Sequence, residues 1–126
     1  MKLQVALDFC KNYQNAKNII DDIEEYVDII ELGTPLLMEC GLDIITKIKS
    51  DYPEKIILSD LKIMDAGRYE TEEALKAGAD MVLMPENFEE AYQGVLDAVV
   101  DGTVSEERIN DSLRRIYRVK LKSRVL

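Results

Sequence analysis

The chain has no histidine and only 2 cysteines in 126 residues. Histidine-assisted nucleophiles, histidine proton shuttles and histidine metal ligands are therefore excluded. Cys10 and Cys40 leave a disulfide or a metal site open, although two cysteines in such a chain are usually reduced and incidental. No apolar run approaches the roughly 18 residues of a membrane span, and the chain starts with a strand pattern rather than a signal peptide. We therefore expect a soluble, cytoplasmic protein.

Basic residues are scarce until the end of the chain, and the net charge is −9. All 25 acidic residues precede Ser112, and the residues after it include Arg114, Arg115, Arg118, Lys120, Lys122 and Arg124. The overall charge argues against non-specific binding to nucleic acid. We interpret the basic tail as the favourable cationic end of a last helix; a phosphate or nucleic-acid grip is the alternative. The apolar fraction of 47% supports a core in one domain, residues 1–126.

Four apolar runs recur along the chain, each followed by a segment of helical period. They span Leu3 to Leu7, Asp28 to Leu32, Ile56 to Leu58 and Met81 to Met84. Near-continuous Val, Ile and Leu is typical of parallel strands buried on both faces, and the intervening segments provide the helical crossovers. We predict helices over residues 16–27, 42–50, 71–76 and 88–99, and a last helix that begins after the N-cap residue Ser105.

This order predicts an α/β fold of (βα)4 type, with an additional C-terminal helix and no fifth strand. It is half of a TIM-type barrel, in which eight strands close the sheet. Four parallel strands leave two edges unpaired, so we expect a homodimer in which two copies pair edge to edge and rebuild eight strands. The alternative is an open, flavodoxin-like parallel sheet, which a persistent monomer would favour.

Charged residues follow three of the predicted strands. Asp60 and Lys62 lie two apart and would share a face, whereas Asp65 falls in the following loop. Asp8 and Glu31 occupy the ends of the first and second strands. Carboxylates converging at one rim would suit Mg²⁺, and the lysine would hold an anionic substrate or move a proton. Each charge taken singly is explained as well by a strand leaving the core; in register together they favour a site.

Residues 1 to about 80 resemble the 3-hexulose-6-phosphate synthase family of the orotidine 5′-monophosphate decarboxylase superfamily. The resemblance lies in LQVALD at residues 3–8, VDIIELGTPL at 27–36, DLKIMDAG at 60–67 and AGAD at 77–80. It implies a homodimeric (βα)8 barrel that joins formaldehyde to ribulose 5-phosphate through a Mg²⁺-stabilised enediolate. By position, Glu31 and Asp60 would be metal ligands, Asp8 and Lys62 would contact substrate, and Asp65 would reach a partner's site.

Residues 77–126 are similar to the end of the catalytic barrel of family 3 glycoside hydrolases. The matching segments are AGADMVLMP, FEEAYQGVLDAV and SEERINDSLRRI. The nucleophilic aspartate of that family lies on an earlier strand that is absent from this sequence. Asp80 and Glu86 are more simply a strand-entry charge and a loop charge. Both families share the tetrapeptide at residues 77–80, so this sequence indicates a recombination of two barrel fragments.

Three functions follow from these resemblances. The leading hypothesis is an engineered chimeric half-barrel scaffold without efficient catalysis, in which Asp8, Lys62 and Asp65 are vestigial, because a phosphate grip and a histidine base are missing. The first alternative is a Mg²⁺-dependent lyase of the hexulose phosphate type that uses ribulose 5-phosphate and formaldehyde. The second is a sugar-phosphate binding module that depends on Lys62. Nucleic acid and membranes are not expected partners.

Overall fold

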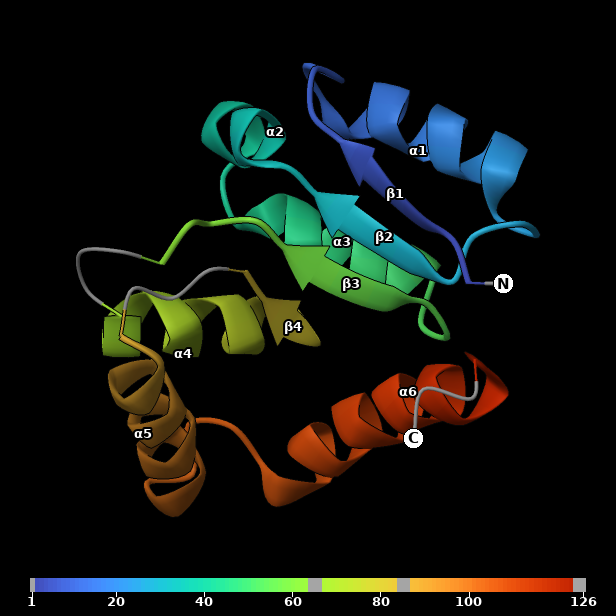
Figure 1. Ribbon diagram of the computed structural model, residues 1–126. Coiled ribbons are helices and arrows are strands. Elements are labelled where there is room, and N and C mark those ends of the chain that lie inside the picture. Colours follow the sequence, from blue (N-terminus) through green and yellow to red (C-terminus); the bar gives the residue numbers. More distant parts are fainter. Residues whose placement is uncertain (1, 64–66, 84–86, 124–126) are drawn as a thin grey trace.

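The centre of the protein is a parallel sheet with strand order β1-β2-β3-β4 (Figure 1). The computed structural model describes residues 2–63, 67–83 and 87–123. The strands are β1 (Gln4–Leu7), β2 (Ile29–Leu32), β3 (Ile56–Ser59) and β4 (Met81–Val82). Strands that follow one another in sequence are therefore neighbours in the sheet, as in a barrel. A flavodoxin-like sheet has β2 at its edge and β1 inside, so the half-barrel prediction is confirmed and the open alternative is wrong.

The register of the strands sorts their residues onto two faces. Leu7 pairs with Leu32, and Leu32 pairs with Ser59, in one row across the sheet. The row before it contains Ala6, Glu31 and Leu58, whose side chains point the opposite way because strand residues alternate. Leu7 and Leu32 are buried, whereas Ala6 is exposed. The face with Leu7 and Leu32 is thus the covered one.

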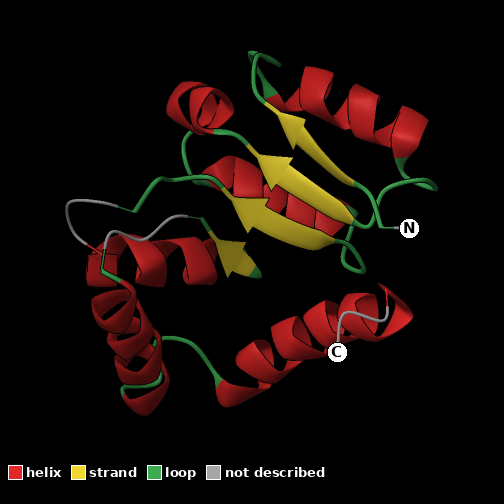
Figure 2. Cartoon of the chain, viewed as in Figure 1, coloured by secondary structure: helices red, strands yellow, loops and turns green. Residues whose placement is uncertain are grey.

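Helices cover that face in the order in which they follow the strands (Figure 2). They are α1 (Tyr13–Ile23), α2 (Thr34–Cys40), α3 (Asp43–Asp51) and α4 (Gly67–Ala77). Ile20 of α1 and Ile44, Ile45 and Ile48 of α3 are buried in one cluster with the covered face of the sheet. Burial of such side chains stabilises the fold by roughly 1.5–3 kcal/mol each.

Two helices close the described chain, as the sequence predicts. They are α5 (Phe88–Val100), which packs against α4, and α6 (Glu106–Ser123), which reaches β3. Asn87 and Ser105 cap the first turns of these helices, because their side-chain oxygens accept backbone N–H bonds from Glu90 and Arg108. None of the helices in the described ranges combines the length and apolarity needed to cross a membrane.

Asp80 anchors α6 to the rest of the fold. Its carboxylate is inaccessible to solvent and accepts hydrogen bonds from Lys49 Nζ at 2.6 Å, Ser112 Oγ at 2.6 Å and Arg115 Nη2 at 2.7 Å. Arg108 lies 3.5 Å away and also donates to the carbonyl of residue 79. Burial by itself would raise the pKa of Asp80, but the bonds from Arg115 and Lys49 outweigh it and lower that pKa. The strand-entry charge of the sequence is the centre of a buried ion cluster.

The basic tail also contributes to the fold. Arg118 pairs with Glu54 at 2.9 Å, Arg114 pairs with Asp111 at 2.5 Å, and Lys120 and Lys122 lie in the last turn of α6. These contacts agree with the interpretation of the tail as the cationic end of a helix. Arg124 lies outside the described residues, as does Glu86. Cys10 and Cys40 are free thiols.

Candidate active site

Asp8 and Asp60 lie in one row just beyond the strands, with Gly33 between them. Gly33 N donates to Leu7 O at 3.0 Å, and Asp60 N donates to Leu32 O at 3.0 Å, so the parallel ladder continues past β1, β2 and β3. A Cβ at Gly33 would lie 1.8 Å from Asp8 Oδ1. The carboxylate of Asp8 therefore lies directly against the glycine backbone, and only glycine at position 33 leaves that place open.

Lys62 turns back toward Asp60. Its Nζ lies 2.6 Å from Asp60 Oδ2 and 3.1 Å from Thr34 Oγ1. Strand alternation placed Asp60 and Lys62 on one face, but β3 ends at Ser59 and Lys62 has a left-handed backbone with φ of 50°. The two side chains do meet, through a turn of the backbone rather than a continuing strand. Half of the Lys62 side chain, 51%, remains exposed to solvent.

One oxygen of Asp60 has no partner. Asp60 Oδ1 is among three buried side-chain oxygens in the described residues that lack a hydrogen bond, with Ser59 Oγ and Thr71 Oγ1, and it alone belongs to a carboxylate. A buried carboxylate oxygen without a donor is costly unless a cation or a ligand completes it. Asp60 therefore fits the role of a Mg²⁺ ligand that the sequence assigns to it.

Glu31 lies deeper in the sheet than Asp60 rather than level with it. It is inside β2, paired with Ala6 and Leu58, so it is not at the end of its strand and not equivalent to Asp8 as the sequence suggested. Because its row lies two residues before that of Asp8 and Asp60, alternation places all three on the same, open face. Its Oε2 accepts a 2.6 Å hydrogen bond from Gln4 Nε2. The residue is on the right face for a ligand and is held by a neighbour on β1.

A complete set of protein ligands is not assembled at this rim. Within residues 2–63, 67–83 and 87–123, no three His, Cys, Asp or Glu side chains lie close enough to hold a metal ion together. Mg²⁺ commonly keeps several waters and binds through one or two carboxylates. Glu31 and Asp60 fit that smaller demand. Asp65, the predicted cross-site residue, lies outside the described residues.

Sequence reasoning missed two residues of the rim, Gly33 and Thr34. Thr34 Oγ1 donates to the carbonyl oxygen of Asp60 at 2.7 Å and accepts from Lys62 Nζ. It starts α2, a helix of 7 residues that the sequence did not indicate. The signal was the proline at position 35, because proline favours the first turn of a helix and so predicts that Gly33 and Thr34 form its entry.

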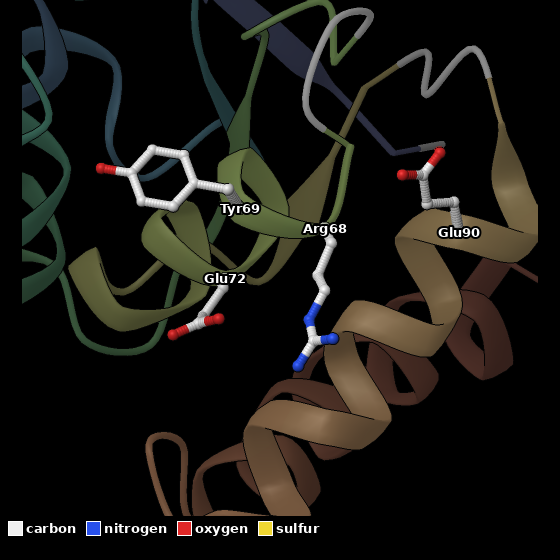
Figure 3. Close-up of a pocket in the computed structure, with 4 residues that line it drawn as sticks. All are labelled: Arg68, Tyr69, Glu72 and Glu90. Carbon is white, nitrogen blue, oxygen red and sulfur yellow. The ribbon is translucent and has the colours of Figure 1, made fainter.

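The largest hollow among the described residues is elsewhere, between α4 and α5. It encloses about 330 Å³ and is lined by Arg68, Tyr69, Glu72 and Glu90. Figure 3 shows that these four side chains do not converge on one point. Arg68 pairs with Asp97 and Glu72 pairs with Lys76, so the charges are already partnered. The rim formed by Asp8, Glu31, Gly33, Thr34, Asp60 and Lys62, which we call the carboxyl-end rim, is the better candidate.

Comparison with known proteins agrees with this choice. Residues 1–84 match the model of the orotidine 5′-phosphate decarboxylase / HUMPS family. The chain belongs to this family. It is 51% identical over 82 residues to a 3-hexulose-6-phosphate synthase of Mycobacterium gastri, and 38% identical over 108 residues to one of Bacillus subtilis. These alignments cover 65% and 86% of the chain but 39% and 48% of the relatives, so the chain spans less than half of their length.

Solved structures show the same relation. The 3-hexulose-6-phosphate synthase of Salmonella typhimurium superposes with a TM-score of 0.71 at 38% identity, over 78% of this chain and 48% of that one. A KGPDC from Streptococcus mutans, solved in complex with a sugar phosphate, gives a TM-score of 0.68 at 26% identity, over 90% of this chain and 61% of that one. In both comparisons most of this chain corresponds to a part of a longer protein.

The leading functional hypothesis from the sequence is wrong. Relatives with 51% and 38% identity are named 3-hexulose-6-phosphate synthase, which favours that enzyme type over an engineered scaffold without efficient catalysis. The Bacillus subtilis alignment covers 86% of the chain and so continues past residues 77–80, where we expected a change of parent. A β-N-acetylglucosaminidase from Thermotoga maritima superposes with a TM-score of 0.66 at 18% identity, a likeness of fold alone. The glycoside hydrolase origin is not confirmed.

Proposed function

We propose that the carboxyl-end rim serves a Mg²⁺-dependent aldol lyase reaction of the 3-hexulose-6-phosphate synthase type. The observation that carries this proposal is the buried, unpartnered Oδ1 of Asp60 beside the amine of Lys62, at the carboxyl end of a barrel strand. That end of the strands is where barrel enzymes place their chemistry. The names of the relatives supply the reaction, and the rim supplies residues of the required type.

In this proposal, Glu31 and Asp60 hold Mg²⁺. The metal supplies positive charge to the substrate oxygens on which negative charge develops. Lys62 has one N–H left after its bonds to Asp60 and Thr34, and that N–H donates to an anionic substrate. Asp8 contacts the substrate from the far side of Gly33. Asp65 keeps its proposed role at a partner's site.

The reaction forms one carbon–carbon bond between formaldehyde and ribulose 5-phosphate. A proton leaves the sugar carbon that attacks, and a proton is added to the formaldehyde oxygen, so the step is balanced without an oxidant or a reductant. A carboxylate or an amine is the type of group that moves such protons. Within this rim, Asp8 and Lys62 are the groups placed to do so.

The test is formaldehyde consumption by the purified chain with ribulose 5-phosphate and Mg²⁺. We expect turnover that EDTA abolishes and that Lys62→Met lowers by about 10²-fold or more. Lys76→Met is a matched control, because Lys76 is also a solvent-exposed lysine in an ion pair, with Glu72 at 2.6 Å, but lies on α4. Absence of any turnover, or equal loss in both variants, would contradict the proposal.

We also propose that two copies of the chain associate. Within the described residues, β1 pairs only with β2 and β4 only with β3, so each outer strand has an edge without a partner. Exposed edges of this kind invite pairing with another chain. Light scattering should give twice the mass of 14.4 kDa. A monomer at all concentrations would contradict this part of the proposal and leave the lyase assay unaffected.

A second candidate is binding of a sugar phosphate without turnover. It is favoured by the structural neighbour solved with such a ligand, which matches 90% of this chain. In this case the N–H of Lys62 that remains free holds the anion, and Mg²⁺ dependence is weak. Titration with ribulose 5-phosphate separates the two candidates, since heat without formaldehyde consumption indicates a binding module alone.

A further inference from the structure

Thr34 is placed differently from the polar residues that begin other helices of the chain. Asn12, Asn87 and Ser105 each use a side-chain oxygen to accept a backbone N–H from the first turn of α1, α5 and α6. At α2 the N-cap is Gly33, which has no side chain, and the Thr34 hydroxyl does not cap the helix. That hydroxyl points across to the end of β3 instead.

The hydrogen bonds of Thr34 have a fixed direction. A hydroxyl has one proton, and Thr34 Oγ1 donates it to the carbonyl oxygen of Asp60 at 2.7 Å. Its lone pairs therefore face Lys62 Nζ, which donates at 3.1 Å. The same amine donates to Asp60 Oδ2 at 2.6 Å. Thr34, Lys62 and Asp60 form a closed loop of three contacts that joins α2 to β3.

This loop holds Lys62 in a backbone conformation that a lysine rarely adopts. The φ of 50° lies in the left-handed region, which costs a residue with a Cβ roughly 1–2 kcal/mol. Among the described residues no strand partner fixes Lys62 beyond the end of β3, and half of its side chain faces solvent. The contacts to Thr34 and Asp60 are the described ones that offset this cost and fix the amine.

We propose that Thr34 is a positioning residue for Lys62. It holds the lysine amine at the carboxyl-end rim, so that two of the three ammonium N–H groups are used by the protein and the third is presented to an anionic ligand. Thr34 acts through Lys62 and not on the substrate. The ligand in this inference rests on the proposed function, but the positioning of the amine does not.

The experiment compares three variants of the full chain. Thr34→Val keeps the shape of the side chain and removes the hydroxyl, and Thr34→Ser keeps the hydroxyl. Thr46→Val is the control, because Thr46 Oγ1 also donates to a main-chain carbonyl in another segment, that of residue 77, at 2.9 Å and away from the rim. The first readout is the mobility of the Lys62 side chain, from ¹³C relaxation at its Cε. The second is the Kd for ribulose 5-phosphate with Mg²⁺.

We expect Thr34→Val to increase the mobility of Lys62 and raise the Kd about three- to tenfold, the range for one hydrogen bond to a partly exposed charge. Thr34→Ser should restore both values, and Thr46→Val should change neither. Unchanged Lys62 mobility in Thr34→Val, or an equal increase in Thr46→Val, would overturn the inference. If no sugar phosphate binds the unmodified chain, the proposed function fails, and the mobility measurement still decides the role of Thr34.

Discussion

Two buried aspartates at opposite ends of the sheet have opposite surroundings. Asp80 precedes β4 and Asp60 follows β3, and each residue is 7% exposed. Asp80 is surrounded by three cationic side chains and a hydroxyl, and both of its oxygens are bonded. Asp60 has one lysine, and one of its oxygens has no partner. The comparison suggests that a fully partnered buried charge maintains the fold, whereas a partly partnered one is kept for a ligand.

Removing the carboxylate of Asp80 is the largest change that this comparison predicts. In Asp80→Ala, the cations of Lys49, Arg108 and Arg115 stay close together and largely buried without their counter-charge. Breaking a buried ion pair from one side costs about 3–5 kcal/mol, so urea unfolding should show a loss of that size. Because Arg108 and Arg115 belong to α6, we also expect that helix to detach first.

An exposed ion pair is the control for Asp80. The pair of Arg118 and Glu54 also joins α6 to the body of the protein, but the Glu54 side chain is 79% exposed. Glu54→Ala should therefore cost at most about 0.5 kcal/mol. If both variants lose the same stability, burial is not what makes the Asp80 cluster important.

The pH dependence of stability sharpens the same comparison. The pKa of Asp80 is lowered in the folded protein because the bonds from Arg115 and Lys49 outweigh its burial. A lowered carboxyl pKa contributes stability that is present above the unfolded value, about 3.9, and is lost as the pH falls through the folded value. The stability difference between the unmodified chain and Asp80→Asn should therefore be constant above about pH 5 and shrink at lower pH. A difference that does not change between pH 6 and pH 3 would contradict this assignment.

The sequence predicted the sheet well because its signal is local. Each apolar run became a strand within a residue or two, for example Ile29–Leu32 for the run from Asp28. The rim was predicted in part. Asp8, Asp60 and Lys62 are near one another as expected, but Glu31 lies two residues deeper in the register, because the apolar run does not show where the strand ends.

Contacts between distant segments could not be read from the pattern. Nothing local distinguishes Asp80, with its cations 28 and more residues away, from an ordinary loop charge. The role of Gly33 depends on the place of the Asp8 side chain, 25 residues earlier. The positive φ of Lys62 belongs to a turn that begins where strand alternation stops being informative.

A methyl group at Gly33 tests whether the rim depends on close packing. The φ of this residue is −71°, so Gly33→Ala adds no backbone strain, but its Cβ would lie 1.8 Å from Asp8 Oδ1. Asp8 must move, and we expect a loss of about 1–2 kcal/mol in unfolding together with weaker binding of ribulose 5-phosphate. Gly67→Ala is the control, because its Cβ would meet Ile63 at an ordinary 3.7 Å. Binding equal to that of the unmodified chain would show that Asp8 is not needed there.

The smallest expected effect concerns the free oxygen of Asp60. If Oδ1 binds Mg²⁺ in the folded state alone, a concentration ten times the Kd adds about 1.4 kcal/mol and raises the Tm by a few degrees. In Asp60→Asn this increase should disappear, while stability without Mg²⁺ changes by less than about 1 kcal/mol because an incompletely partnered buried charge has been removed. NaCl at the same ionic strength separates binding from screening, since screening acts equally on both proteins. An equal Tm increase in Asp60→Asn would place the cation elsewhere and leave the unpartnered oxygen of Asp60 without an explanation.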